Sequence, residues 1–235
     1  MGLILAIVLL QQTSSCGVEA NALVTRAAAL AEALDLSGAA RSYADAAMTG
    51  CDDAVLPALY LEGLQAARDA YGVGGADWSL EKVRKAIAAL ETRASSGDRA
   101  AEIARVTLLA ATAAAQSERD DMATFLAQAT YLERLQHAAA PNAMLPATAH
   151  EVAGDLWLQV HRFDTAQQAY RAAADLVGMT PRIAAGLART AVRLKEVAAA
   201  CAAYRTLLDV WKDRAGLPAE VGEARMYLRF QNCPP

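Results

Sequence analysis

The feature that most constrains the fold is a stretch of ten residues that nearly recurs thirty-four residues later. Residues 166–175 read AQQAYRAAAD, and residues 200–209 read ACAAYRTLLD. Small residues keep the same spacing in other segments of the chain, at Gly154, Ala188 and Gly222. Because self-similarity at a period of roughly twenty to fifty residues indicates a repeat array, we expect stacked copies of one supersecondary unit.

Composition makes the α-helix the expected building block of this array. Ala accounts for about a quarter of the chain and is the best helix former. Only 6% of the residues are aromatic, and no run alternates β-branched residues as a strand would. The positions of turn residues predict eleven helices. Breaks are expected at Ser37-Gly38 and at a flexible loop over residues 72–77, and Pro146 is expected in the first turn of the seventh helix. The helices are expected over residues 20–34, 39–48, 52–71, 77–94, 98–116, 120–140, 146–161, 164–178, 180–194, 197–214 and 218–231.

The repeat contains two helices per thirty-four residues. Its small residues include Ala166 and Ala200, and a tyrosine follows each of them four positions later, at Tyr170 and Tyr204. The chain resembles the tetratricopeptide-repeat (TPR) family, most clearly over residues 147–235. The resemblance implies an all-α fold, a right-handed α-solenoid of about five antiparallel helix hairpins plus a C-terminal capping helix. Since one hairpin cannot bury its apolar face alone, each repeated Tyr is expected to lie over the neighbouring hairpin.

The N-terminal residues are interpreted as an export signal that precedes one helical domain. Residues 1–19 are the signal region, residues 20–235 are the domain, and an internal boundary is considered near residues 141–146. Leu3–Leu10 is an unbroken apolar run, too short for a membrane span of about 20 residues but long enough for the core of a signal peptide. No Lys or Arg precedes it. We expect an exported protein of the bacterial periplasm or cell envelope, or a cytoplasmic one if the segment is not a signal.

Two processing sites compete in this region. Val18-Glu19-Ala20 is a tolerable cleavage site with small residues. Thr13-Ser14-Ser15-Cys16 resembles the lipobox of bacterial lipoproteins, in which the cysteine is lipidated. Thr13 departs from that motif, where Leu is usual. Lipidation of Cys16 therefore stands as an alternative to cleavage behind Ala20.

No motif in the chain indicates catalysis, a metal or a cofactor. His137, His150 and His161 have neither a second His nor a Cys at the spacing of metal ligands. Signatures of phosphate loops, hydrolases and calcium loops are missing as well. The net charge of −4 provides no overall attraction for nucleic acid. We therefore expect a non-enzymatic chain whose partners are proteins or peptides, with membrane contact only through an N-terminal lipid or uncleaved signal.

The family resemblance implies that an inner groove, lined by the first helices of the hairpins, holds a peptide. The offsets carry this role to Glu151, Asp155, Gln159, Arg182, Arg189, Arg193, Glu223 and Tyr227. Asp155, Arg189 and Glu223 share one repeat position and alternate in sign, so neighbouring repeats can neutralise one another. On the other interpretation, Arg182 and Arg193 are left over and bind an acidic or C-terminal carboxylate of the partner.

Four cysteines allow three pairings, and the repeat geometry favours one of them. Cys201 and Cys233 occupy nearly equivalent places one repeat apart, so stacking brings them together. Cys16 and Cys51 lie at the same end of one hairpin and can pair only if Cys16 is neither lipidated nor removed. The alternative is four reduced thiols in a cytosolic protein. A disulfide requires Cα atoms within about 7 Å of each other.

These observations predict a non-catalytic scaffold for protein–protein interaction, exported to the cell envelope. Two alternatives stay open. The chain resembles, in layout only, the tetratricopeptide lipoproteins that help to assemble outer-membrane proteins, which implies a lipid-anchored assembly subunit. It is also compatible with a helical accessory domain for an enzyme on another chain.

Overall fold

A computed structural model describes residues 16–32, 34–72, 77–141, 144–212 and 218–233. Within these ranges the chain forms eleven α-helices and no strand. The helices are α1 (Val18–Glu32), α2 (Leu36–Met48), α3 (Asp52–Gly72), α4 (Asp77–Ser95), α5 (Arg99–Ala115), α6 (Arg119–Ala139), α7 (Ala149–Gln159), α8 (Phe163–Val177), α9 (Pro181–Arg193), α10 (Val197–Trp211) and α11 (Ala219–Phe230). The expected all-helical fold is confirmed.

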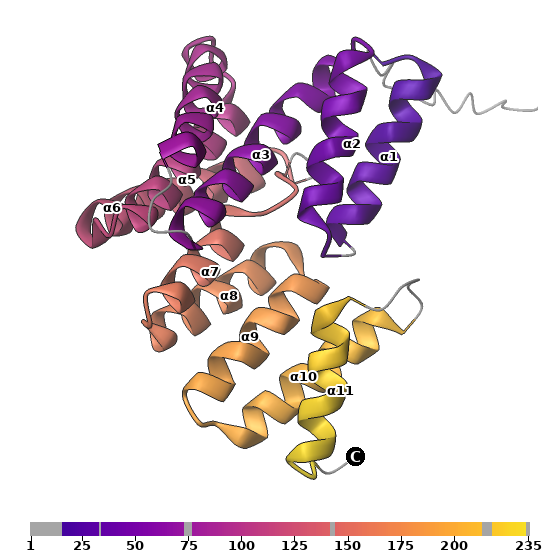
Figure 1. Ribbon diagram of the computed structural model, residues 1–235, viewed down its shortest axis with the longest axis vertical. Helices are drawn as coiled ribbons and strands as arrows, with labels where there is room; N and C mark the ends of the chain where they lie inside the picture. The colour runs from indigo at the N-terminus through magenta and orange to yellow at the C-terminus, as the bar shows by residue number, and fades with distance from the viewer. Residues whose placement is uncertain (1–15, 33, 73–76, 142–143, 213–217, 234–235) are drawn as a thin grey trace, which may run out of the picture.

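The helices pair as five antiparallel hairpins, α1/α2 to α9/α10, followed by the single helix α11 (Figure 1). Each hairpin packs on the next in sequence order, as the contacts of α2 with α3, α4 with α5 and α8 with α9 show. The result is an α-solenoid, with the α1/α2 hairpin at one end and α11 at the other. The array curves, so that α1 and α2 lie on the same side of the molecule as α10 and α11 (Figure 1).

One turn recurs at the end of the first helix in four hairpins. In each turn one non-glycine residue adopts a left-handed φ of 62–65°, and the positions are Leu34, Ser117, His161 and Lys195. The next residue donates its backbone N–H to the carbonyl five residues earlier, as Glu196 does to Ala191 at 2.9 Å. This is the Schellman arrangement, which satisfies the last carbonyls of a helix and reverses the chain.

The repeated tyrosines pack between successive hairpins, as expected from the sequence. The ring of Tyr170 on α8 is buried. It leaves no room for a side chain at Gly154 on α7 or Gly186 on α9, where an added Cβ would lie 2.6 and 2.3 Å from the ring. Tyr204 on α10 reaches the next helix, α11, where its ring centroid lies 4.9 Å from that of Tyr227. Gly154 and Gly186 therefore give the Tyr170 ring the space to pack against both neighbouring helices.

Two helix starts differ from the sequence prediction. The first break lies at Leu34-Asp35, and Ser37-Gly38 belongs to the first turn of α2. The Asp35 side chain caps this turn by accepting the Gly38 N–H at 2.7 Å. A Cβ at Gly38 would lie 2.2 Å from the Asp35 carboxylate, so the glycine makes room for the cap and does not break the helix.

The second difference concerns α7, which begins at Ala149, so Pro146 lies before the helix. Thr148 caps α7 through a capping box with Glu151. Glu133 of α6, only 1% exposed, accepts the N–H groups of Ala149 and His150 at 2.6 and 3.1 Å. A carboxylate from another helix thus satisfies the first donors of α7 and favours its dipole.

The apolar core is continuous across the segment considered as an internal boundary, residues 141–146. Leu145 and Ala147 are buried in the same cluster as residues of α3, α5 and α6. The Tyr60 hydroxyl of α3 donates to the Ala147 carbonyl at 2.9 Å, in a buried hydrogen bond. Tertiary contacts therefore hold the start of α7 to the N-terminal hairpins.

The described fold begins earlier than residue 20. Helix α1 starts at Val18, and Ala20 is buried in the core. The helical domain thus includes Val18 and Glu19, which were expected to belong to the signal region. The apolar run Leu3–Leu10 and the first three residues of the lipobox lie outside the described part, as do residues 73–76 of the expected loop, whereas the expected cleavage site Val18-Glu19-Ala20 lies in α1. No helix in the described ranges is long and apolar enough to cross a bilayer.

Candidate functional site

The concave side of the solenoid contains a cavity of about 530 Å³. Its walls come from α3, α7 and α9, with single residues from α5, α8 and α11 and the start of α2. The apolar part includes Leu61, Leu64 and Leu158, and the polar part includes Gln65, Arg68, Asp155, Gln159, Arg182, Arg189 and Glu220. A second hollow of about 500 Å³ adjoins it, and Gln159 and Arg189 line both. Apolar walls with a few polar groups are typical of binding sites.

Six of the eight residues predicted for the groove line these hollows. Asp155, Gln159, Arg182 and Arg189 line the larger cavity, and Gln159, Arg189, Arg193 and Glu223 line the smaller hollow. Tyr227 lines neither, since its ring packs against Tyr204. Glu151 also lies outside both and is discussed next.

Glu151 has a structural role. It is buried, and its Oε2 accepts the backbone N–H of Thr148 at 2.8 Å within the capping box. Its Oε1 accepts the hydroxyl of Thr180 at 3.2 Å, which ties α7 to the N-cap of α9. Its placement in the groove by repeat offset is therefore wrong, because helix capping turns the carboxylate inward.

Arg182 is not a left-over cation. Its Nη2 forms an ion pair with the Asp155 carboxylate, which also accepts the Tyr170 hydroxyl at 2.5 Å. Asp155 therefore pairs with Arg182 and is not the partner of Arg189 that the alternating series predicted. The Nη1 group of Arg182 is buried without a hydrogen-bond partner among the described residues. The cavity wall thus includes a donor that is not satisfied within the described protein.

The other part of the alternating series is present. Arg189 donates to Glu223 through Nε at 3.1 Å and through Nη2 at 2.7 Å, and Nη2 also reaches Glu220 at 3.3 Å. Tyr204 donates its hydroxyl to Glu223 at 2.5 Å. These contacts join α9 and α10 to α11, so Arg189 and Glu223 stabilise the interface between the last hairpin and the final helix.

The hydrogen bonds shift the pKa values of these groups. Burial raises the pKa of Glu223, but the hydrogen bonds from Arg189 and Tyr204 outweigh it, so the pKa lies below the ordinary value of 4.5. Burial and the contact with Glu223 raise the pKa of Tyr204. Burial and the contact with Asp155 raise the pKa of Tyr170. Both tyrosines are therefore neutral donors near neutral pH, and Glu223 is an ionised acceptor.

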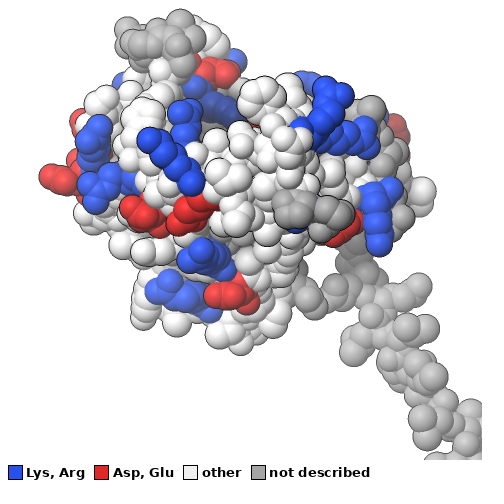
Figure 2. All heavy atoms as spheres, turned by 90° about the horizontal axis from the view of Figure 1, so that it is seen from below, with Lys and Arg blue, Asp and Glu red and all other residues white. Residues whose placement is uncertain are grey.

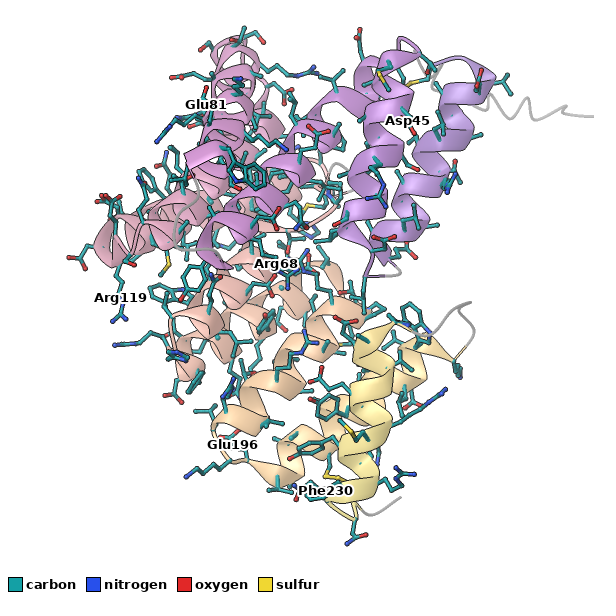
Figure 3. All side chains as sticks on the ribbon, in the orientation of Figure 1. Asp45, Arg68, Glu81, Arg119, Glu196 and Phe230 are labelled. Atoms are coloured by element: carbon teal, nitrogen blue, oxygen red, sulfur yellow. A yellow bond between two sulfur atoms is a disulfide. The ribbon has the colours of Figure 1, made fainter. Side chains whose placement is uncertain are left out.

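Two exposed arginines on the cavity walls have no ion-pair partner among the described residues, Arg68 on α3 and Arg193 on α9. Arg68 lies on the part of α3 that approaches the α7–α9 layer (Figure 3). Figure 2 shows acidic and basic groups interspersed among uncharged ones on the end of the molecule that it presents. Among the described residues that line the two hollows, the arginines without an ion-pair partner are thus Arg68 and Arg193.

The buried pair of Glu133 and His150 was not predicted from the sequence. The His150 Nδ1 lies 2.6 Å from the Glu133 Oε2, and both side chains are at most about 5% exposed. The pair belongs to the α6–α7 junction described above. The sequence signal that could have indicated it is the position of Glu133, an acidic residue on the apolar side of the helix expected over residues 120–140. Within the described ranges, no group of three or more His, Cys, Asp and Glu side chains could hold a metal ion.

The cysteines form two disulfides in the structure. Cys201 and Cys233 have Cα atoms 5.8 Å apart, and Cys16 and Cys51 have Cα atoms 4.6 Å apart. These are the pairings that the repeat geometry favours, and both meet the distance requirement of a disulfide. One bridge joins the start of α1 to the start of α3, and the other joins α10 to the end of α11. A bonded Cys16 has no thiol for a lipid.

Comparison with solved structures identifies the fold. The chain is similar to the crystal structure of a thermophilic TPR protein from Thermus thermophilus, with a TM-score of 0.53 and 17% sequence identity. The similarity covers 89% of this chain and 99% of that one. The chain has a tetratricopeptide-repeat fold. No family model and no curated protein sequence matches it. At this identity the similarity establishes the TPR-like architecture, and function must be argued from the groove itself.

Proposed function

We propose that this TPR-like chain is a non-catalytic scaffold that holds a segment of a partner protein in its concave groove. The observation that carries the proposal is the cavity of about 530 Å³, to which most of the hairpins contribute. Solenoids bind partners along such concave surfaces. Leucine side chains offer apolar contact, and fixed ion pairs hold the polar part of the wall in place. A preorganised wall lowers the entropy cost of binding.

The free charges indicate which segment the groove fits. Arg182 and Arg189 are neutralised by carboxylates of the protein itself. Arg68 and Arg193 are exposed on the walls and have no such partner in the described ranges. We therefore assign the carboxylate-binding role to Arg68 and Arg193. The partner segment carries apolar side chains and at least one acidic group.

A charge-reversal pair of variants tests this proposal. A peptide selected from a displayed library on the full chain is titrated by fluorescence anisotropy. We expect Arg68→Glu to weaken its binding by about tenfold, since attraction becomes repulsion. Arg119→Glu is the matched control, because Arg119 is exposed on α6 and points away from the groove (Figure 3). Equal losses in both variants, or none in either, contradict groove binding.

We further propose that the protein is exported and that it functions in the cell envelope. The apolar run Leu3–Leu10 supports export. The two disulfides support it too, because disulfides persist mainly in oxidising compartments. Mass spectrometry of the protein from its native host, with and without reduction, tests the proposal. Two bridges and a mature chain that retains Cys16 are expected, whereas an intact N-terminus with four free thiols contradicts export.

The lipid-anchored alternative requires that Cys16 carry a lipid instead of a disulfide. A lipidated Cys16 cannot bond to Cys51, so the same spectra distinguish a lipid adduct from a bridge. No feature of the described residues favours an accessory role beside an enzyme on another chain. The interaction scaffold is therefore the function that the groove supports best.

A further inference from the structure

The outward face of α11 carries large exposed apolar side chains, although a terminal helix of a solenoid normally presents polar residues to solvent. Met226 is 64% exposed and Phe230 is 82% exposed. With the exposed Gly222, they lie four residues apart and form one stripe along the helix. We call Gly222, Met226 and Phe230 the α11 stripe.

The repeat register shows what covers the position of Gly222 in the preceding repeats. Gly154 on α7 is buried under Tyr170, which comes from the second helix of the same hairpin. Ala188 on α9 is buried in one cluster with Tyr204, again from the second helix of its hairpin. At Gly222 an added Cβ would meet no atom of the described residues within 4 Å. Among those residues, the place of a second helix, and of its tyrosine, is open on α11.

The backbone after α11 repeats the turn that leads into a second helix. Asn232 adopts a left-handed φ of 48°, and the Cys233 N–H donates to the Leu228 carbonyl at 3.0 Å. The same bond follows α1, α5, α7 and α9, where an antiparallel helix comes next. The α11 stripe thus belongs to a hairpin with one helix among the described residues.

Charge along the stripe identifies the occupant. Arg225 and Arg229 are exposed along one edge and have no ion-pair partner among the described residues. On the other edge, Glu223 already forms an ion pair with Arg189 and accepts the Tyr204 hydroxyl. The uncompensated charge beside the apolar stripe is therefore positive.

We propose that the α11 stripe docks an acidic amphipathic helix of another protein, which completes a sixth hairpin in trans. An apolar or aromatic side chain of that helix fills the space over Gly222, and carboxylates on its edge pair with Arg225 and Arg229. A second copy of this chain fits poorly through the same face, because a two-fold contact repeats one patch on both sides and supplies no carboxylate to the arginines.

A peptide based on a helix that fills the equivalent place is the probe. It copies residues 163–177 with Arg171→Glu, which makes it acidic, and a hydrocarbon staple on its exposed face holds it helical. Binding to the full chain is followed by fluorescence anisotropy. A second peptide that also carries Tyr170→Ala is the control for the aromatic contact. We expect the first peptide to bind, and the second to bind about tenfold more weakly.

Variants of the full chain locate the binding. Gly222→Leu occupies the open space, and Arg225→Glu combined with Arg229→Glu reverses the edge charge. We expect each change to weaken binding by about tenfold or more. Met48→Ser, which removes an exposed methionine on α2, and Arg119→Glu are the matched controls and leave binding unchanged. Circular dichroism of Gly222→Leu verifies that the fold persists.

Three results overturn the proposal. The first is a peptide that fails to bind, or that binds Gly222→Leu as well as the unmodified chain. The second is self-association in sedimentation velocity that Phe230→Ser abolishes, which assigns the stripe to a second copy. The third is binding to phosphatidylglycerol vesicles that Phe230→Ser abolishes, without peptide binding, which assigns the stripe to a membrane surface.

Discussion

Substitution of equivalent glycines by alanine should have opposite effects in different repeats. Gly154 and Gly222 share one repeat position, and Gly186 faces the same ring as Gly154. An added Cβ would lie 2.6 Å from the Tyr170 ring at Gly154 and 2.3 Å from it at Gly186. At Gly222 it would meet no atom of the described residues within 4 Å. The same substitution therefore adds a methyl group to a filled space at Gly154 and Gly186, and to open solvent at Gly222.

The size of each effect follows from two opposing terms. Alanine stabilises a helix interior relative to glycine by about 0.5–1 kcal/mol. Forcing a methyl group into a packed core costs about 1–3 kcal/mol. The Tyr170 ring cannot yield cheaply, since it lies between two helices and its hydroxyl bonds to Asp155. We expect Gly154→Ala and Gly186→Ala to lose about 1–2 kcal/mol and Gly222→Ala to gain up to about 1 kcal/mol.

Urea unfolding followed by far-UV circular dichroism measures these differences. Equal m-values across the variants are needed for comparison, because repeat arrays can unfold in steps. In thermal melts, a gap of about 2 kcal/mol between Gly186→Ala and Gly222→Ala corresponds to a Tm difference of roughly 4–8 °C. If all three variants shift stability in the same direction, the close packing of Tyr170 against α7 and α9 is refuted.

Three further predictions concern the C-terminal repeats. Removing the bridge with Cys201→Ser and Cys233→Ser should lower the free energy of unfolding by about 3–4 kcal/mol in the chain-entropy model, and no change in urea midpoint would argue against this bridge. The folded-state pKa of Glu223 lies below 4.5, so its contribution is fully present above that pH and is lost as pH falls through the folded value. The stability gap between the unmodified chain and Glu223→Gln should therefore narrow in acid, and a constant gap from pH 7 to pH 3 would count against the hydrogen bonds described. Lys195→Gly should raise stability by about 0.5–1 kcal/mol, because glycine suits a left-handed φ, whereas Lys195→Ala should not, and thermal melts compare the two.

The helical repeat could be predicted because its physical cause is local. Periodic small residues and tyrosines, together with turn residues, define where helices pair and where they end. Gly38 misled the prediction, because glycine is a common helix breaker and its need for space beside the Asp35 cap appears only in three dimensions. Thr148 was missed for a related reason, since Pro146 is also acceptable in a first helical turn. Local sequence thus located the helices but not every cap.

The groove was only partly predictable from repeat offsets. Equivalent positions share a direction, so Asp155, Arg189 and Glu223 do line the hollows. Repeat offsets do not determine ion-pair partners, since Asp155 pairs with Arg182 and not with Arg189. Glu133 has no counterpart in the repeat, and its contact with the start of α7 depends on how α6 and α7 cross. Long-range side-chain pairing was therefore beyond what spacing alone can give.

The curvature of the array has a consequence for how the groove could change its width. Ser37 near the start of α2 and Glu220 of α11 line the same cavity, although every hairpin between them separates them along the chain. The opening between these ends is set by the sum of small rotations at successive hairpin interfaces. A small change in the angle between hairpins that pack at Tyr170 or Tyr204 therefore produces a larger change in the distance between Ser37 and Glu220. The width of the groove is a property of the whole stack and of no single residue on its wall.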